Sequence, residues 1–203
     1  MLNILTDELP VTVRVDGREH PVRWQYHHMI KVEVALHDPE IEENERLFNA
    51  MLIFYGGELP KDIQAAAEGM IAFLRYDKPL NRAQQREAKR NKHSPTLFCY
   101  DHDDELIFAA FMQHYGINLA RTTDMHWYEF RALLSGLDEC PFTRIKGWRG
   151  TELGKIKNAQ ERARMGELKE LCALPNSAQV QQELDEIDRI LLGDGDLSGF
   201  MGR

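Results

Sequence analysis

Residues 47 to 74 read LFNAMLIFYGGELPKDIQAAAEGMIAFL, and this stretch decides the class of the fold. Apolar residues recur at helical spacing in two blocks, separated by Gly56-Gly57 and Pro60, which end one helix and precede the next. The first block has its apolar side chains at Leu47, Phe48, Met51, Leu52 and Tyr55. The second has them at Ile63, Ala66, Ala67, Met70, Ile71 and Leu74. Two successive amphipathic helices predict a mainly α domain.

Residues 11–24 predict a small N-terminal β-hairpin. The strand residues alternate between apolar and polar types, and Asp16-Gly17 suits the positive backbone angles of a two-residue turn. This register places Arg14 opposite Glu19, a pair that favours it weakly. Because two strands alone are marginal in water, we expect the hairpin to lie on the helices.

Further helices are predicted on both sides of these elements. A helix starts at Tyr26, and Asp38-Pro39 has the residue types of an N-cap followed by a first helical residue. In the second half, one helix follows the acids of residues 101–105 and ends at Gly116. Another starts near Thr123-Asp124. The core residues predicted in this helix and in the segment that follows it are Trp127, Phe130, Leu134, Leu137, Phe142, Ile145 and Trp148.

The last quarter of the chain predicts a charged helical arm. A four-three-four spacing typical of a short coiled coil is formed by Val180, Leu184, Ile187 and Leu191. These four residues are the predicted partner-binding residues, and packing of the same stripe on its own domain is an open alternative. The sequence thus predicts a mainly α fold, with a β-hairpin and helical domain over residues 1–150 and a helical C-terminal arm with a flexible tail over residues 151–203.

Composition limits the class of protein. Hydrophobic residues make up 43% of the 203-residue chain, enough for a core, which excludes a wholly disordered protein. No apolar run reaches the roughly 20 residues that cross a bilayer, and the N-terminus lacks the pattern of a signal peptide. We therefore expect no membrane association and a cytoplasmic location. The cysteines, which have no metal-binding or disulfide spacing, are interpreted as small hydrophobic residues: Cys99, Cys140 and Cys172.

A basic segment interrupts an acidic chain. The net charge is −8, yet residues 78–92 hold six basic residues and one acid, a local charge of +5. Such a segment can contact phosphates, which makes a nucleic-acid-binding regulator the alternative function. The segment has no aromatic stacking residues and no recognition-helix pattern, so a solvated connector is the preferred interpretation and nucleic acid is not the expected partner.

No motif of a known catalytic or cofactor site is present. The densest set of possible metal ligands comprises Asp101, His102, Asp103, Asp104, Glu105 and His126. Consecutive acids fan around a helix axis instead of converging, so helix capping and solubility are preferred to a metal-dependent hydrolase. Residues 194–199 are similar to the start of a calcium loop but lack its closing glutamate. We therefore predict a non-enzymatic protein with no metal and no cofactor.

The second half of the chain resembles a family of phage proteins. The similarity to the bacteriophage gene-product-fifteen family is carried by Tyr100-Asp101, Asp104, Leu106–Phe111, Tyr115–Leu119, His126–Leu134 and Gly136-Leu137. It covers the chain from Val11 to about Arg149, and its most specific part is the His-Trp-x-x-Phe motif. The signature residues are Asp101, Asp104, Phe111, Tyr115, His126, Trp127 and Phe130. The chain departs from the family at Asn118, where an acid is more usual, and in its longer C-terminal arm.

The resemblance implies a function in tail assembly. Family members are encoded between the major tail protein and the tape-measure protein of long-tailed phages and prophages. That position implies a chaperone that binds the long, helical tape-measure protein and keeps it soluble in the host cytoplasm until the tail tube polymerises around it. The implied partner is thus the tape-measure protein, and a homo-oligomer is a further expectation. An acidic body with amphipathic helices agrees with such a role.

Overall fold

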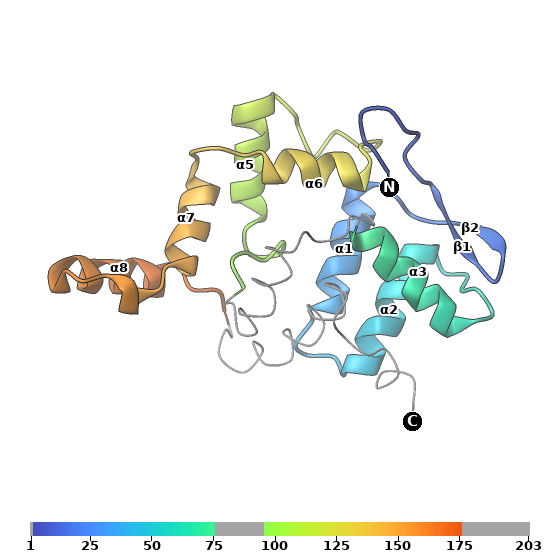
Figure 1. Cartoon of the computed structure of the whole chain (residues 1–203), viewed down its shortest axis with the longest axis horizontal. Coiled ribbons are helices and arrows are strands. Elements are labelled where there is room, and N and C mark those ends of the chain that lie inside the picture. Colours follow the sequence, from blue (N-terminus) through green and yellow to red (C-terminus); the bar gives the residue numbers. More distant parts are fainter. Residues whose placement is uncertain (1, 76–95, 176–203) are drawn as a thin grey trace.

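The computed structural model describes residues 2–75 and 96–175, and their architecture is mainly helical with one N-terminal hairpin, as predicted (Figure 1). The elements in chain order are β1 (Thr12–Val15), β2 (Arg18–Pro21), α1 (Tyr26–Leu36), α2 (Glu43–Tyr55), α3 (Ile63–Arg75), α5 (Asp104–Tyr115), α6 (Trp127–Ser135), α7 (Pro141–Gly150), the 3-10 helix η1 (Leu153–Lys155) and α8 (Ala159–Leu171). Figure 1 shows the hairpin and α1–α3 on one side, α5–α7 beside them, and α8 at the opposite end.

The hairpin has the predicted register. Arg14 pairs with Glu19, and the Arg14 Nε and Glu19 Oε1 atoms are 3.4 Å apart. The turn residues Asp16 and Gly17 have φ angles of 49° and 74°, in the left-handed region that this two-residue turn requires. Strand β1 lies on α3, which confirms the expectation that the hairpin packs on the helices.

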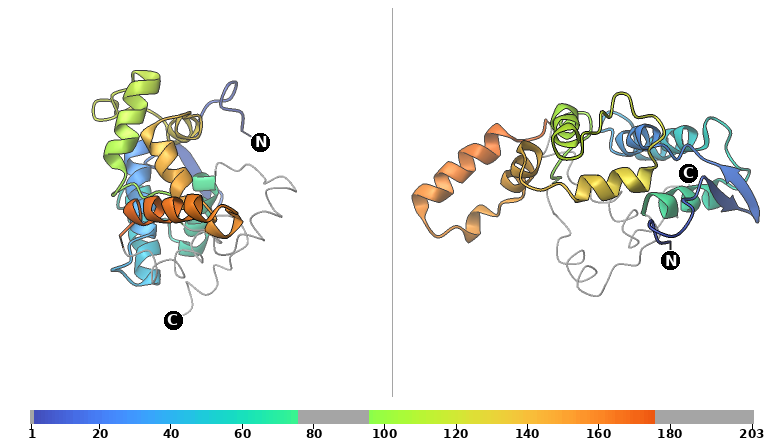
Figure 2. Two further views of the ribbon diagram at one scale, coloured as in Figure 1. Left: turned by 90° about the vertical axis from the view of Figure 1, so that its left-hand side faces the viewer. Right: turned by 90° about the horizontal axis from the view of Figure 1, so that it is seen from above.

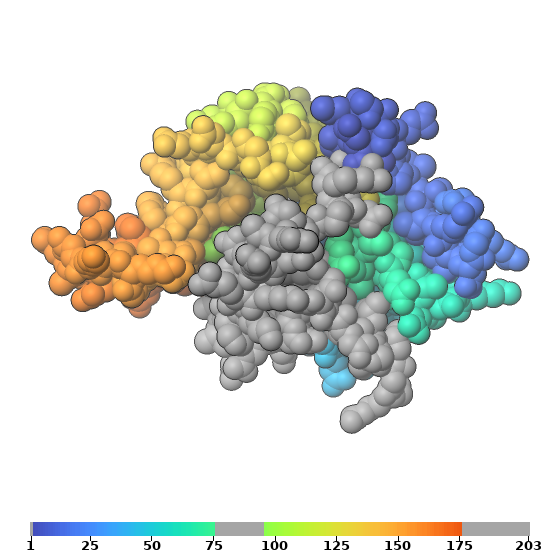
Figure 3. Space-filling model, viewed as in Figure 1, coloured from blue at the N-terminus to red at the C-terminus, as the bar shows by residue number. Residues whose placement is uncertain are grey.

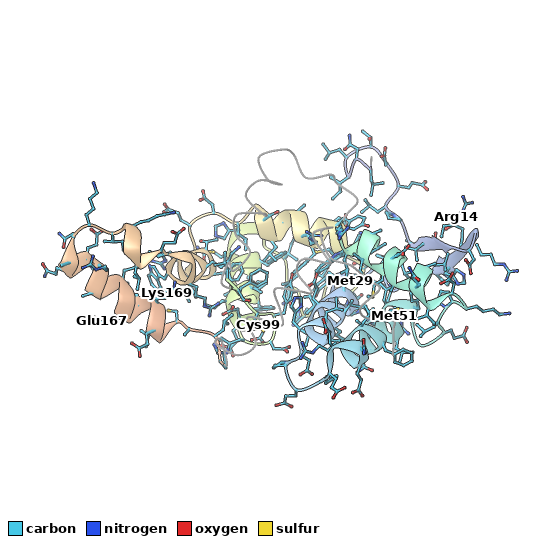
Figure 4. The ribbon with its side chains drawn as sticks, turned by 60° about the horizontal axis from the view of Figure 1, so that its bottom comes forward. Arg14, Met29, Met51, Cys99, Glu167 and Lys169 are labelled. Atoms are coloured by element: carbon cyan, nitrogen blue, oxygen red, sulfur yellow. The ribbon has the colours of Figure 1, made fainter. Side chains whose placement is uncertain are left out.

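Helices α1 and α2 form an antiparallel pair in which Met29 and Met51 are buried (Figure 4). Helix α2 begins at Glu43, later than the start predicted at Asp38-Pro39. Asp38 does not cap a helix, because its Oδ1 accepts a hydrogen bond from the Glu40 N–H at 2.9 Å and closes a turn. The prediction is wrong here because an aspartate before a proline stabilises a turn as readily as a helix start.

The apolar residues predicted for α2 are buried at Leu47, Met51 and Tyr55 but not at Phe48. Phe48 is 45% exposed, whereas Phe54 is fully buried and packs against Phe73 of α3 with ring centroids 5.3 Å apart. The prediction that Phe48 faces the core is therefore wrong. Helix α2 carries apolar side chains around much of its circumference, so their spacing does not distinguish the face that α3 covers.

Aromatic stacking joins the two halves of the chain. Phe130 of α6 stacks on Tyr26 of α1 and on Phe111 of α5, with ring centroids 5.0 and 5.1 Å apart. Beside this stack, the backbone N–H of Trp127 donates a hydrogen bond to the backbone carbonyl of Trp24 at 3.0 Å. Because one ring contacts both halves, α1, α5 and α6 share a single core.

Residues 151–175 form an arm that projects from the body (Figure 2). Helix α8 has no buried residue, and Leu171 near its end is 82% exposed. The arm folds back on itself, since Lys169, which Figure 4 labels beside Glu167, donates from Nζ to the Thr151 carbonyl at 3.0 Å. The prediction of a helical C-terminal arm is confirmed for these residues, and the division of the chain at residue 150 stays a prediction.

Candidate docking surface

Helix α5 presents apolar side chains to solvent. Phe108 is 37% exposed and Met112 is 41% exposed, and Ala109 is exposed beside them. Residues 108 and 112 are one helical turn apart, so their side chains adjoin along the helix. In Figure 3 the yellow-green surface of α5 lies along the upper edge of the molecule. We call Phe108, Ala109 and Met112 the α5 apolar face.

Carboxylates border the beginning of this face. Asp101, Asp104 and Glu105 are exposed, and Glu105 lies on the same side of the helix as Phe108 and Met112 because these residues are three and four positions apart. An apolar stripe beside acidic groups favours a partner helix whose apolar residues are flanked by lysine or arginine. The α5 apolar face can therefore distinguish partners by charge as well as by hydrophobic contact.

The opposite side of α5 is held in the core. Its buried residues are Ile107, Ala110 and Phe111. The Tyr115 hydroxyl donates a hydrogen bond to the Leu133 carbonyl of α6 at 2.8 Å, and Gly116 ends the helix with a φ of 66°. These contacts fix the orientation of α5, so its apolar face stays exposed without any rearrangement of the helix.

A buried ion pair anchors the start of α5. Asp103 and Arg149 are 1% and 5% exposed, and their Nη1–Oδ2 and Nη2–Oδ1 distances are 2.6 and 2.9 Å. The carboxylate also accepts the Cys99 N–H at 3.0 Å, while the guanidinium donates to the carbonyls of Leu97 at 3.1 Å and Cys172 at 2.6 Å. The pair therefore ties α5, α7 and the chain after α8 together.

Sequence reasoning missed this ion pair. Asp104 and Glu105 lie in the first turn of α5, where acids favour the helix dipole, as the sequence suggested. Asp103 differs, because its side chain makes no capping hydrogen bond and instead meets Arg149 in the interior. Four acids and a histidine in consecutive positions do not indicate which side chain a distant arginine will reach, so no local signal could have identified it.

His126 is a structural residue at the start of α6. Its Nδ1 accepts a hydrogen bond from the Tyr128 N–H at 3.1 Å, its Nε2 lies 2.9 Å from the Pro10 carbonyl oxygen, and its ring stacks on Trp24. Glu129 completes a capping box by accepting the His126 N–H at 2.8 Å. Burial lowers the pKa of His126, because a buried imidazolium loses its hydration.

This geometry also corrects the predicted start of α6. The helix begins at Trp127 with His126 as its N-cap, so the start predicted near Thr123-Asp124 is wrong. Threonine and aspartate are the commoner capping residues, but here the contacts of the His126 ring with the N-terminal segment decide which residue caps the helix.

The structure separates the seven signature residues into two groups. The aromatic ones belong to the core: Phe111, Trp127 and Phe130 are at most 1% exposed, and Tyr115 is half-buried. His126 is buried with them, whereas Asp101, before α5, and Asp104, in its first turn, are exposed. Most of these residues therefore maintain the fold, and the two carboxylates are available to a partner.

The possible metal ligands do not converge in the described part of the chain. Within residues 2–75 and 96–175, no group of three or more His, Cys, Asp or Glu side chains could hold a metal ion. The three cysteines are free; Cys140 is buried, and Cys99 and Cys172 are half-buried. No helix in these two ranges has the length and hydropathy needed to span a bilayer.

Several predicted features lie outside the described residues. They are the basic segment of residues 78–92, the calcium-loop-like residues 194–199, and the predicted partner-binding residues Val180, Leu184, Ile187 and Leu191. The α5 apolar face, which the sequence did not single out, is thus the candidate docking surface that the structure describes.

Comparison with known protein families identifies the relatives of this chain. A family model described as Bacteriophage Gp15 protein matches residues 5–174. The chain belongs to this family. The match includes the α5 apolar face, both residues of the buried ion pair and α8, so it extends past residue 149, where the resemblance seen in the sequence ended. No curated protein and no solved structure shows a significant match.

Proposed function

We propose that this chain is a non-enzymatic tail-assembly chaperone that binds the tape-measure protein in the host cytoplasm. Membership of the Bacteriophage Gp15 protein family supports a role in the phage life cycle. The α5 apolar face supports a binding role, because Phe108 and Met112 remain exposed on a helix whose other side is held in the core. This exposed face is the observation that carries the proposal.

The client segment that fits this face is an amphipathic helix. Its apolar side chains would pack on Phe108 and Met112, and its basic side chains would lie near the carboxylates of Asp101, Asp104 and Glu105. Completing the burial of a partly exposed phenylalanine or methionine contributes on the order of 1 kcal/mol. One such site binds weakly, so a long client with repeated helical segments would engage several copies of the chaperone.

A second docking element is proposed in the C-terminal residues. The coiled-coil spacing of Val180, Leu184, Ile187 and Leu191 supports a contact with a helical client. The variant Leu184→Glu with Ile187→Glu tests it, because two carboxylates in the apolar stripe would prevent helix–helix packing. Unchanged solubility of the tape-measure protein with this variant would argue against a docking role for the stripe.

Co-expression with the tape-measure protein of the same phage tests the main proposal. The wild-type chain is expected to increase the soluble fraction of the client and to copurify with it. Phe108→Asp with Met112→Asp is expected to lower the affinity by about tenfold or more, because two apolar contacts are lost. Phe48→Asp is the control for an exposed apolar side chain, since Phe48 is slightly more exposed than Phe108 and Met112 but lies on α2.

The controls separate loss of binding from loss of the fold. Circular dichroism spectra and thermal unfolding of the three proteins should agree closely, because all the substituted side chains are substantially exposed. A client that stays soluble and bound with the α5 double variant would contradict docking at α5. A wild-type chain with no effect on client solubility and no copurification would contradict the proposed function itself.

A further inference from the structure

Strand β1 has an edge whose backbone groups are unused. The Val22 N–H donates to the Val11 carbonyl at 3.1 Å, so the backbone groups of Val11 face β2. Hydrogen-bonded and non-hydrogen-bonded pairs alternate in an antiparallel ladder, so the N–H and C=O groups of Thr12 and Arg14 point away from β2. Within the described residues, no hydrogen bond occupies these groups. The hairpin lies at the periphery of the molecule, where this edge can meet a partner (Figure 1).

The outer edge of β2 is closed to a further strand. Its outward backbone positions are Glu19 and Pro21, which lie opposite Arg14 and Thr12. Pro21 has no N–H, so a strand added on this side would lose a hydrogen bond and would meet the proline ring. Natural sheets commonly protect an edge in this way. Because β1 contains no proline, its edge is the one of the two that can accept another strand.

The valines of β1 are arranged symmetrically about Val13. Val11, Val13 and Val15 share one face of the strand, and α3 covers part of it, since a Cβ at Gly69 would lie 3.7 Å from Val15 Cγ2 and 3.8 Å from Val13 Cβ. Val15 is buried and Val13 half-buried, whereas Val11 is 47% exposed. An antiparallel strand of the same sequence centred on Val13 places Val13 opposite Val13 and Val11 opposite Val15. The exposed Val11 would then be covered by a valine.

The same register uses the free backbone groups. With Val13 opposite its counterpart, Thr12 of each copy lies opposite Arg14 of the other, and each such pair can exchange two hydrogen bonds. A shift of one residue would turn the valines of the second copy to the wrong face. A shift of two residues would place Arg14 opposite Arg14 in one direction, or opposite Pro10, which has no N–H, in the other. The edge therefore specifies one register.

Small residues on α3 permit this pairing. A two-fold axis at the edge of β1 brings the α3 helices of two copies side by side beneath the sheet. Ala65, Gly69 and Ala72 follow one another at intervals of four and three residues, so they lie along one side of α3, and Gly69 approaches β1. Helices with small residues between them can pack with their axes about 8 Å apart.

We propose that two copies of this chain pair through β1 and form a dimer with a four-stranded antiparallel sheet of order β2-β1-β1-β2. The partner is a second copy because the strand is complementary to itself in its backbone hydrogen bonds and in its valines, and a two-fold axis lets both copies use the same surface. Four strands also form a more stable sheet than the two of an isolated hairpin. This association goes beyond the proposed function, because it requires no client and does not involve α5.

Sedimentation velocity of the purified full-length chain tests the proposal. The average mass of the wild type is expected to rise with protein concentration from that of the monomer toward that of the dimer. Thr12→Pro removes an edge N–H from each copy and places a ring in the interface, so it should weaken dimerisation by about tenfold or more. Glu19→Pro is the matched control, because it places the same residue at an outward position of β2, and it should dimerise as the wild type does. Circular dichroism should show that both variants keep the fold, since neither N–H is used within the hairpin.

Disulfide trapping tests the register. In the proposed dimer, Thr12→Cys in one copy lies opposite Arg14→Cys in the other, on the face of the sheet away from α3. A mixture of these two variants treated with oxidised glutathione is expected to form a cross-linked dimer. Each variant alone should not, because identical positions are then diagonal neighbours, too far apart for a disulfide. The wild type, with its three free cysteines, gives the background.

Three results would overturn the proposal. They are a wild type that stays monomeric at every concentration, an equal loss of dimerisation in Thr12→Pro and Glu19→Pro, and a mixture of the cysteine variants that cross-links no more than its separate components.

Discussion

The Asp103 carboxylate and the Arg149 guanidinium form a bidentate ion pair across 46 residues of sequence, with both groups buried. Each partner also bonds to backbone groups, the carboxylate to the Cys99 N–H and the guanidinium to the carbonyls of Leu97 and Cys172. A buried pair with all these bonds satisfied is far costlier to break than an exposed one. The position of α5, and with it the proposed docking surface, depends on this pair.

Arg149→Met is expected to lower the free energy of unfolding by about 3–5 kcal/mol, because Asp103 then remains buried without its partner. Urea unfolding followed by circular dichroism measures the change. Asp103→Asn combined with Arg149→Met should recover part of the loss, since no charge is left buried. The control is Arg14→Met at the exposed Arg14–Glu19 pair, expected to cost less than about 1 kcal/mol. Similar losses in the two single variants would contradict the assigned role.

Mild acid is expected to destabilise the chain through His126. Burial holds the pKa of His126 below its ordinary value of 6.5, so the unfolded chain binds the proton more readily than the folded chain. This stabilisation is complete above pH 6.5 and is lost as the pH falls toward the lowered pKa. His126→Asn keeps a capping residue that does not titrate, so its unfolding free energy should fall less between about pH 7 and about pH 5. An identical pH dependence in both proteins would rule His126 out as the cause.

Alanine is expected to have opposite effects at Gly116 and Gly147. Gly116 ends α5 with a φ of 66°, and an alanine in this conformation costs about 1–2 kcal/mol. Gly147 lies inside α7, and a Cβ added there meets nothing within 4 Å, so Gly147→Ala should gain about 0.5–1 kcal/mol. Thermal unfolding of the two variants under the same conditions measures both effects. Destabilisation at both positions would contradict the claim that a methyl group at Gly147 meets no neighbouring atom.

Gly69 is expected to reject a large side chain because α3 approaches β1 there. An added Cβ would lie 3.3 Å from the Tyr55 hydroxyl and 3.7 Å from the Val15 Cγ2 methyl. Gly69→Leu would displace the hairpin, and we expect a loss of about 1–3 kcal/mol together with faster hydrogen exchange in β1. Gly147→Leu is the control, and no loss of stability is expected there, because the position is open and leucine favours a helix more than glycine does. Slow exchange in β1 of Gly69→Leu would contradict the packing of the hairpin on α3.

The elements were predicted well wherever their signals are local. The Asp16-Gly17 turn has the positive φ angles that the residue types suggest, and Gly56 and Gly116 end α2 and α5 in the left-handed conformation. Prediction failed at two helix starts, near Asp38-Pro39 and near Thr123-Asp124. In the second case the capping residue is chosen by the ring contacts of His126 with a segment more than a hundred residues earlier, which no local pattern contains.

The candidate site was less predictable than the fold. The sequence indicated the acids at residues 101–105 and the C-terminal stripe as candidate sites, whereas the structure shows Phe108 and Met112 exposed on α5. The helical spacing of Ile107, Ala110 and Phe111 indicates the buried side of α5, but it does not show whether other parts of the chain cover the remaining apolar side chains. The exposure of this face becomes visible only when α6 and α7 are in place.

The sequence by itself determined the mainly α class, the N-terminal hairpin and the family, because turn chemistry, helical periodicity and a motif such as His126-Trp127-x-x-Phe130 depend on residues close together in the chain. Only the tertiary structure decided that Phe130 packs between Tyr26 and Phe111, and that the buried Asp103 meets Arg149. Burial and ion pairing depend on which distant segments pack together, and that choice is made by the whole core.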